Sequence, residues 1–183
     1  MSQSNARLLR LVETAIMIAL AVALSYVKLF KMPQGGSVTL GSMVPIMLIA
    51  LRHGAGWGVA TGAIAGLIQY MLEPYFVHPV QFLLDYPLAF AALGLAGLAH
   101  GRPFMAAAWL GPVALLGRFV AHVISGAVFF AEYAPAGQSP WVYSMIYNGS
   151  YMLPELVISG VLLMLLLPTL ERALPSRVRS LNG

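Results

Sequence analysis

The sequence predicts an all-α, polytopic membrane protein, and its composition carries that prediction. Apolar residues make up 60% of the 183 residues and charged residues only 9%, and the mean hydropathy is +0.82. A soluble domain has about 25% charged residues, so a soluble chain of this length could not bury so much apolar surface. A helix crosses a bilayer in about 20 apolar residues, which leaves room for roughly six transmembrane helices in one integral membrane domain, residues 1–183.

The first predicted helix runs from about Ala6 to Leu29. It lacks a small-residue cleavage site, so we expect a retained helix and not a signal peptide. A proline and two consecutive glycines prevent a helix in the loop Lys31–Ser37. The second helix, about Leu40–Leu51, is short and contains Pro45. It cannot span a membrane alone, so we expect the preceding loop to continue it inside the protein.

Four longer helices follow. The third covers about Ala55–Leu72, and the fourth covers Val80–Leu98 with a kink near Pro87, where a backbone donor is missing. The fifth covers about Ala106–Phe130. The sixth covers about Val142–Leu170, after a loop that is rich in proline and glycine.

The distribution of Lys and Arg predicts the orientation of these helices. With six spans both termini lie on one side of the membrane, and that side collects seven arginines: Arg7, Arg10, Arg52, Arg102, Arg172, Arg177 and Arg179. The other side has only Lys28 and Lys31. Because cytoplasmic loops carry the excess of positive charge, we expect both termini in the cytoplasm. The aromatic loops after the first, third and fifth helices then face outward.

Three of the ionisable residues within the predicted spans are the first candidates for a functional role. Asp85 lies in the fourth helix, and Arg118 and His122 lie one helical turn apart in the fifth. Charged groups at membrane depth are costly and usually face a cavity, a partner or a substrate path. The structural alternative is that Asp85 pairs with Arg118 and that His122 bonds to a neighbouring helix. A lone histidine of this kind is a poor metal site, so we expect no metal.

The last helix opens with polar and aromatic residues. Tyr147, Tyr151 and Glu155 form a stripe at four-residue spacing, and Tyr143 and Asn148 lie near the predicted outer mouth. Tyrosines are common at membrane interfaces for structural reasons alone. The amide of Asn148 is a stronger signal, because inside a span it needs hydrogen-bond partners.

Two helices carry small residues at four-residue spacing, an arrangement that lets backbones approach closely. The third helix holds a glycine ladder and the first an alanine face, which consist of Gly54, Gly58, Gly62 and Gly66 and of Ala15, Ala19 and Ala23. Such a face usually packs inside its own bundle. One of the two can instead dock another membrane subunit.

Missing motifs exclude several classes of protein. The chain has no cysteine, no phosphate-binding loop, no Gly-x-Ser-x-Gly and no His-Glu-x-x-His, so it neither hydrolyses ATP through a phosphate-binding loop nor carries these hydrolase signatures. The sequence has no run of basic residues interleaved with aromatic residues, so it gives no sign of nucleic-acid binding. Two other functions remain open: a proton-coupled secondary carrier of a small cationic metabolite, with Asp85 and His122 as the relay, and a membrane-embedded enzyme using His122 and Ser125.

Several segments, in order along nearly the whole chain, resemble one family. They are Glu13–Ile16, Met32–Ser37, His78–Gln81 running on to Asp85-Tyr86, Arg118–Phe130 and Trp141–Asn148. Together they resemble the thiamine-specific substrate-binding subunits of bacterial energy-coupling-factor transporters. The resemblance implies a six-helix protein of the cell membrane that binds thiamine near its outer face, without a cofactor and without being an enzyme. It also implies a transmembrane coupling subunit and two cytoplasmic ATPase subunits as partners.

The resemblance also assigns residues. By motif position the ligand contacts fall on Asp85, His122, Tyr143, Asn148, Tyr75 and Phe130. Phe130 stands where some members have a stacking tryptophan, and Gly36 stands where some place a tryptophan in the first loop. The alanine face resembles the surface that docks the coupling subunit.

The chemistry of thiamine suits these residues. Its thiazolium ring carries a permanent positive charge, which favours a carboxylate and aromatic faces in a partly dry pocket. Its aminopyrimidine needs a hydrogen-bonding amide or hydroxyl and a stacking partner. We expect a single buried carboxylate, Asp85, which disfavours thiamine diphosphate because the phosphates would meet negative charge.

Overall fold

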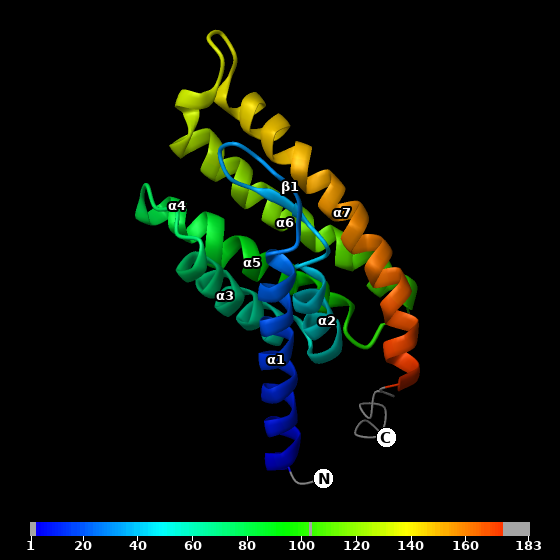
Figure 1. Cartoon of the computed structure of the whole chain (residues 1–183). Coiled ribbons are helices and arrows are strands. Elements are labelled where there is room, and N and C mark those ends of the chain that lie inside the picture. The colour runs from blue at the N-terminus through cyan, green and yellow to red at the C-terminus, as the bar shows by residue number, and fades with distance from the viewer. Residues whose placement is uncertain (1–2, 103, 174–183) are drawn as a thin grey trace.

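We describe the fold from a computed structural model, which describes residues 3–102 and 104–173 and is mostly helical (Figure 1). The elements in chain order are α1 (Gln3–Ser25), β1 (Lys28–Lys31), β2 (Ser37–Thr39), α2 (Val44–His53), α3 (Ala55–Leu72), α4 (Pro79–Leu83), η1 (Leu84–Leu88), α5 (Ala89–Ala92), η2 (Leu93–Ala99), α6 (Phe104–Phe129), η3 (Ala131–Tyr133) and α7 (Pro140–Ala173). Within these described residues, five segments are long and apolar enough to cross a membrane: α1, α3, the run from α4 to η2, α6 and α7.

The first helix is shorter than the sequence predicts. It ends at Ser25 and not at Leu29, because Lys28–Lys31 pairs with Ser37–Thr39 in a small antiparallel sheet. Gly35 and Gly36 take φ values of 91° and 88° in the turn between the strands. These left-handed values suit glycine, and they let the chain reverse where the sequence predicts only a loop.

The second helix is short, as its sequence predicts, and the structure shows that it is also deeply buried. Every residue from 41 to 50 is buried, and so are Val38 and Thr39 in the preceding strand. The expectation that the loop Lys31–Ser37 packs inside the protein is wrong, because Lys31 and residues 33–36 are exposed and only Val38 and Thr39, after the loop, are buried. With 10 residues α2 rises about 15 Å, half of a bilayer core, so it does not cross a membrane as a helix by itself.

The fourth predicted helix is irregular at two places. A π-helical turn, η1, surrounds Pro87, because proline cannot donate to the helical ladder. A 3₁₀ segment, η2, ends the run, and its Gly94 approaches α3 so closely that a Cβ would lie 2.1 Å from the backbone nitrogen of Val59. Similarly, a Cβ on Gly62 would lie 2.1 Å from the carbonyl oxygen of Phe90. The glycine ladder of α3 therefore packs inside the bundle.

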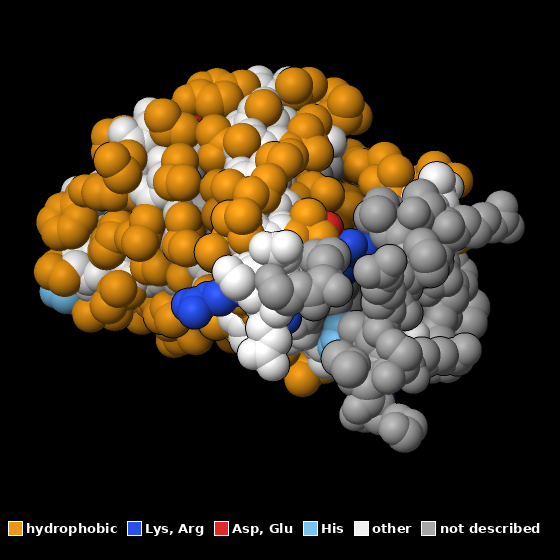
Figure 2. All heavy atoms as spheres, turned by 90° about the horizontal axis from the view of Figure 1, so that it is seen from below, with side chains coloured by type: hydrophobic (Ala, Val, Ile, Leu, Met, Phe, Trp, Pro, Cys, Tyr) orange, Lys and Arg blue, Asp and Glu red, His pale blue; other side chains and the backbone are white. Residues whose placement is uncertain are grey.

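The outer surface matches a protein that sits in lipid. Hydrophobic side chains cover much of the face in Figure 2.

The start of α1 and the end of α7 lie at the same end of the molecule (Figure 1). On α1, Thr14, Ile18 and Ala21 are buried, whereas Ala15, Ala19 and Ala23 are exposed, so the described residues leave the alanine face uncovered.

Candidate functional site

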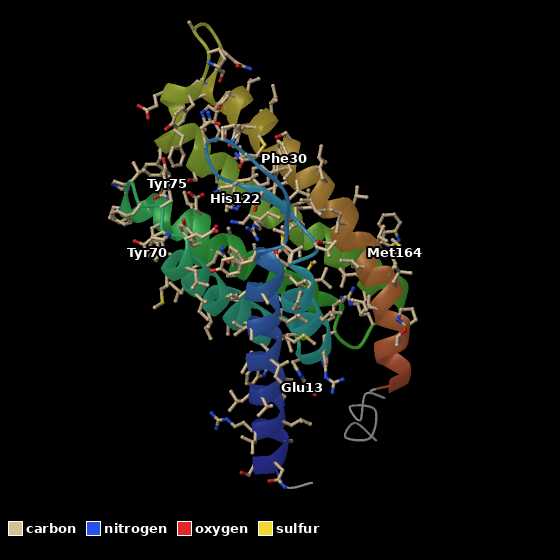
Figure 3. The ribbon with its side chains drawn as sticks, in the orientation of Figure 1. Glu13, Phe30, Tyr70, Tyr75, His122 and Met164 are labelled. Carbon is tan, nitrogen blue, oxygen red and sulfur yellow. The ribbon has the colours of Figure 1, made fainter. Side chains whose placement is uncertain are left out.

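One cavity of about 790 Å³ opens between the β1–β2 hairpin, the loop after α3, η1, α6 and α7. Its size lies within the range of roughly 300–1,000 Å³ that is usual for small-molecule sites. All six residues that the sequence singles out as ligand contacts line it: Tyr75, Asp85, His122, Phe130, Tyr143 and Asn148. In Figure 3, Tyr75 and His122 lie in the upper half of the molecule, and Glu13 lies far below them on α1.

Asp85 is held by hydrogen bonds from three side chains. Its Oδ2 accepts from Nε2 of Gln81 at 2.7 Å and from the hydroxyl of Ser125 at 2.9 Å. Its Oδ1 lies 3.1 Å from Nδ1 of His122. A carboxylate has about four acceptor positions, so roughly one remains for a ligand. The side chain is 18% exposed, which keeps the carboxylate accessible from the cavity.

Arg118 does not pair directly with Asp85, contrary to the structural alternative. Its Nε lies 3.2 Å from Nε2 of His122, so the histidine stands between the two charges. The guanidinium lies over the ring of Phe90, 4.0 Å from the ring centroid. Its Nη1 is buried and has no hydrogen-bond partner in the described part of the chain.

The amide of Asn148 is fixed by its neighbours. Nδ2 donates to the carbonyl oxygen of Ser144 at 2.9 Å and to that of His122 at 3.3 Å. Oδ1 accepts from the hydroxyl of Tyr151 at 2.6 Å. An amide oxygen has two lone pairs, so Asn148 can still accept one hydrogen bond but has little capacity left to donate.

Aromatic rings gather at the mouth of the cavity. The rings of Tyr75 and Phe130 lie 5.8 Å apart, and Phe130 stacks on Tyr133 at 6.3 Å. Partial burial and a hydrogen bond with Tyr133 raise the pKa of Tyr75, so its phenol stays neutral. Tyr143 lines the same cavity from α7. These faces can stack on a flat or cationic ligand.

Two further residues shape the cavity. Gln81 is fully buried and joins Asp85 to the loop after α3, because its Nε2 also donates to the carbonyl oxygen of Tyr75 at 3.3 Å. Its position one turn before Asp85 is the only sequence signal for this role. Glu155 is also fully buried and lines the cavity, so the expectation of a single buried carboxylate is wrong.

The hairpin is tied to α7 at two points. Near its base, Oε1 of Glu155 accepts from the backbone nitrogen of Thr39 at 2.5 Å and from its hydroxyl at 2.6 Å. At its tip, the hydroxyl of Tyr147 donates to the carbonyl oxygen of Gly35 at 2.9 Å. A Cβ on Gly36 would lie 2.6 Å from the ring of Tyr151, so a tryptophan does not fit here without moving the hairpin.

Comparison with known proteins gives one consistent result. A family model described as thiamine transporter protein matches residues 11–174. The thiamine transporter ThiT of Bacillus subtilis (strain 168) is 43% identical over 191 aligned residues, which cover 96% of this chain and 98% of that protein. ThiT of Lacticaseibacillus paracasei is 30% identical over 90% of each chain. A solved structure of ThiT from Listeria monocytogenes matches with a TM-score of 0.78 and 26% identity, over 91% of this chain and 97% of the other.

Proposed function

Because the chain belongs to the thiamine transporter protein family, we propose that it binds thiamine in the cavity between the hairpin, η1, α6 and α7. The protein is a multi-pass protein of the bacterial plasma membrane that takes up thiamine as a substrate-binding subunit, and it is not an enzyme. The ligand contacts proposed are Asp85, His122, Tyr143, Asn148, Tyr75 and Phe130.

One observation carries the proposed site: the half-buried carboxylate of Asp85 and the buried amide of Asn148 line a cavity whose mouth is aromatic. Asp85 and Asn148 each retain capacity to accept a hydrogen bond, whereas the donors of Gln81, Ser125 and Tyr151 are used within the protein. A cavity with free acceptors suits a ligand that donates and is positively charged. Thiamine offers an amino group and a thiazolium cation.

We further propose the assembly in which the subunit works. Its exposed alanine face on α1 docks a transmembrane coupling subunit, and two cytoplasmic ATPase subunits supply the energy. The termini lie in the cytoplasm, and the strand and helix from Ser37 to His53 together form the sixth crossing of a single domain. The shared end of α1 and α7 in Figure 1 supports an even number of crossings.

Calorimetric titration of the purified protein with thiamine tests the proposed site. We expect one thiamine to bind per chain, with no chemical turnover, and thiamine diphosphate to bind more weakly because Asp85 and Glu155 both line the cavity. The variant Glu132→Gln, which changes an exposed carboxylate outside the cavity, is the matched control and should bind like the wild type. Absence of thiamine binding by well-folded protein would contradict the proposal.

The contact between Asp85 and His122 also favours a second function, a proton-coupled carrier, because a carboxylate and a histidine 3.1 Å apart can exchange a proton. Reconstitution in liposomes separates the two functions. Thiamine uptake driven by a pH gradient alone would support the carrier. Uptake that requires the coupling and ATPase subunits would support the energy-coupling-factor assembly.

A further inference from the structure

The hydrogen bonds around His122 fix where its ring protons lie. Nε of Arg118 lies 3.2 Å from Nε2 of the histidine, and a guanidinium nitrogen can only donate. Nε2 must therefore accept and carry no proton. On the other side of the ring, Nδ1 lies 3.1 Å from Oδ1 of Asp85, and a carboxylate accepts. Nδ1 must therefore carry the proton.

We propose that Arg118 is a positioning residue, which holds His122 as the neutral ring with its proton on Nδ1. This inference deepens the thiamine site and rests on the proposed function. Arg118 is itself held in place, since it lies one turn before His122 on α6 and its guanidinium covers the ring of Phe90 at 4.0 Å. The position of its Nε beside Nε2 of His122 therefore depends on both α6 and α5.

This arrangement decides how the site meets a ligand. Both ring nitrogens of His122 form hydrogen bonds within the protein, so a ligand can contact only the carbon edge or the face of the ring. The proton on Nδ1 also completes the set of three donors around Asp85, with Gln81 and Ser125. These donors orient the carboxylate, and they leave about one acceptor position for the ligand.

Nitrogen NMR of protein labelled with ¹⁵N-histidine reads these protons directly, without any thiamine. The chain has four histidines, and the variant His122→Gln assigns the signals of the site. In the wild type we expect His122 to show a protonated Nδ1 and an unprotonated Nε2. In Arg118→Met, measured in the same buffer, we expect Nε2 to carry a proton in a measurable share of molecules, because its donor is gone.

Two further variants keep the result interpretable. Arg118→Lys retains a cationic donor and should restore the unprotonated Nε2. Ser125→Ala removes a different hydrogen bond to Asp85 and should leave the His122 signals unchanged, which separates the ring protons from a general loosening of the site. For Arg118→Met we expect thiamine affinity to fall roughly tenfold, as for the loss of one hydrogen bond of about 1.4 kcal/mol.

Either of two results would overturn the inference: a wild-type ring with its proton on Nε2, or an unchanged ring in a folded Arg118→Met protein. Should that variant fail to fold, the wild type and Arg118→Lys decide, and a protonated Nε2 in either would overturn it. Because the spectra are recorded without ligand, failure here is distinct from failure of the proposed thiamine binding.

Discussion

Three neighbours donate hydrogen bonds to Asp85, and this makes its carboxylate hard to replace. In Asp85→Asn one oxygen becomes an NH₂ group, which then faces a donor from His122, Gln81 or Ser125. The charge that would meet the thiazolium is lost as well. We expect thiamine binding, measured by calorimetry, to weaken by about 1.5–3 kcal/mol, the range for a hydrogen bond to a charged group.

The control for this prediction is Glu132→Gln, which removes the same kind of charge from the surface. Wild-type affinity in folded Asp85→Asn would show that the carboxylate is only structural. A parallel measurement of thermal unfolding distinguishes loss of the ligand contact from loss of the fold.

Phe130 is the second residue whose role can be tested alone. It lies between Tyr75 and Tyr133 at the mouth of the cavity. We expect Phe130→Ala to lower thiamine affinity by roughly 1–3 kcal/mol, by analogy with base–aromatic stacking, and Phe130→Trp to bind as well as the wild type or better. Phe129→Ala is the matched control, because the neighbouring ring stacks on His78 and does not line the cavity. Equal losses in both alanine variants would contradict a stacking role for Phe130.

At the scale of elements, α3 packs closely against the segment from α4 to η2, and this segment carries Asp85. Gly62→Ala would place a methyl group against the backbone of Phe90, which cannot move without shifting α5. We expect a loss of stability of about 1–3 kcal/mol, as for other overpacked sites. Thermal unfolding in one detergent measures it.

Gly56 on the same helix provides the control, since a Cβ there meets nothing within 4 Å. Gly56→Ala should keep or raise the unfolding temperature, because alanine favours a helix over glycine by up to about 1 kcal/mol. If the two variants unfold alike, the close approach of α3 does not limit stability.

For the whole molecule, the exposed alanine face of α1 is the surface that we propose docks the coupling subunit. Ala19→Trp should fill the close-approach surface and abolish ATP-dependent thiamine uptake in vesicles that contain all subunits. Thiamine binding by the isolated variant should persist, because Ala19 does not line the cavity. Binding and uptake are measured on the same preparation.

The matched control is Leu20→Trp, which adds bulk at the same depth about 100° further round the helix. Leu20 is also exposed, so the control should retain more uptake than Ala19→Trp. Loss of both binding and uptake in Ala19→Trp would show that the alanines hold the bundle together.

The sequence by itself determines the membrane class, the helical architecture and the family. Its apolar composition leaves no soluble alternative, and α3 begins and ends where the sequence predicts, at Ala55 and Leu72. It also indicates that Asp85 and His122 matter, because ionisable groups inside apolar segments are rare. The six predicted contacts do line one cavity, although their binding of thiamine stays a prediction.

Only the tertiary structure decides the partners of these residues. Glu155 bonds Thr39 across 116 positions of sequence, and His122 separates Arg118 from Asp85. The hairpin likewise cannot be predicted from its local sequence, because its strands are short and are held by hydrogen bonds from α7, such as that of Tyr147. Composition and helical spacing report which face a residue occupies. Which polar atom meets which depends on how distant elements pack, since each buried donor or acceptor must find a partner among the neighbours that the fold supplies.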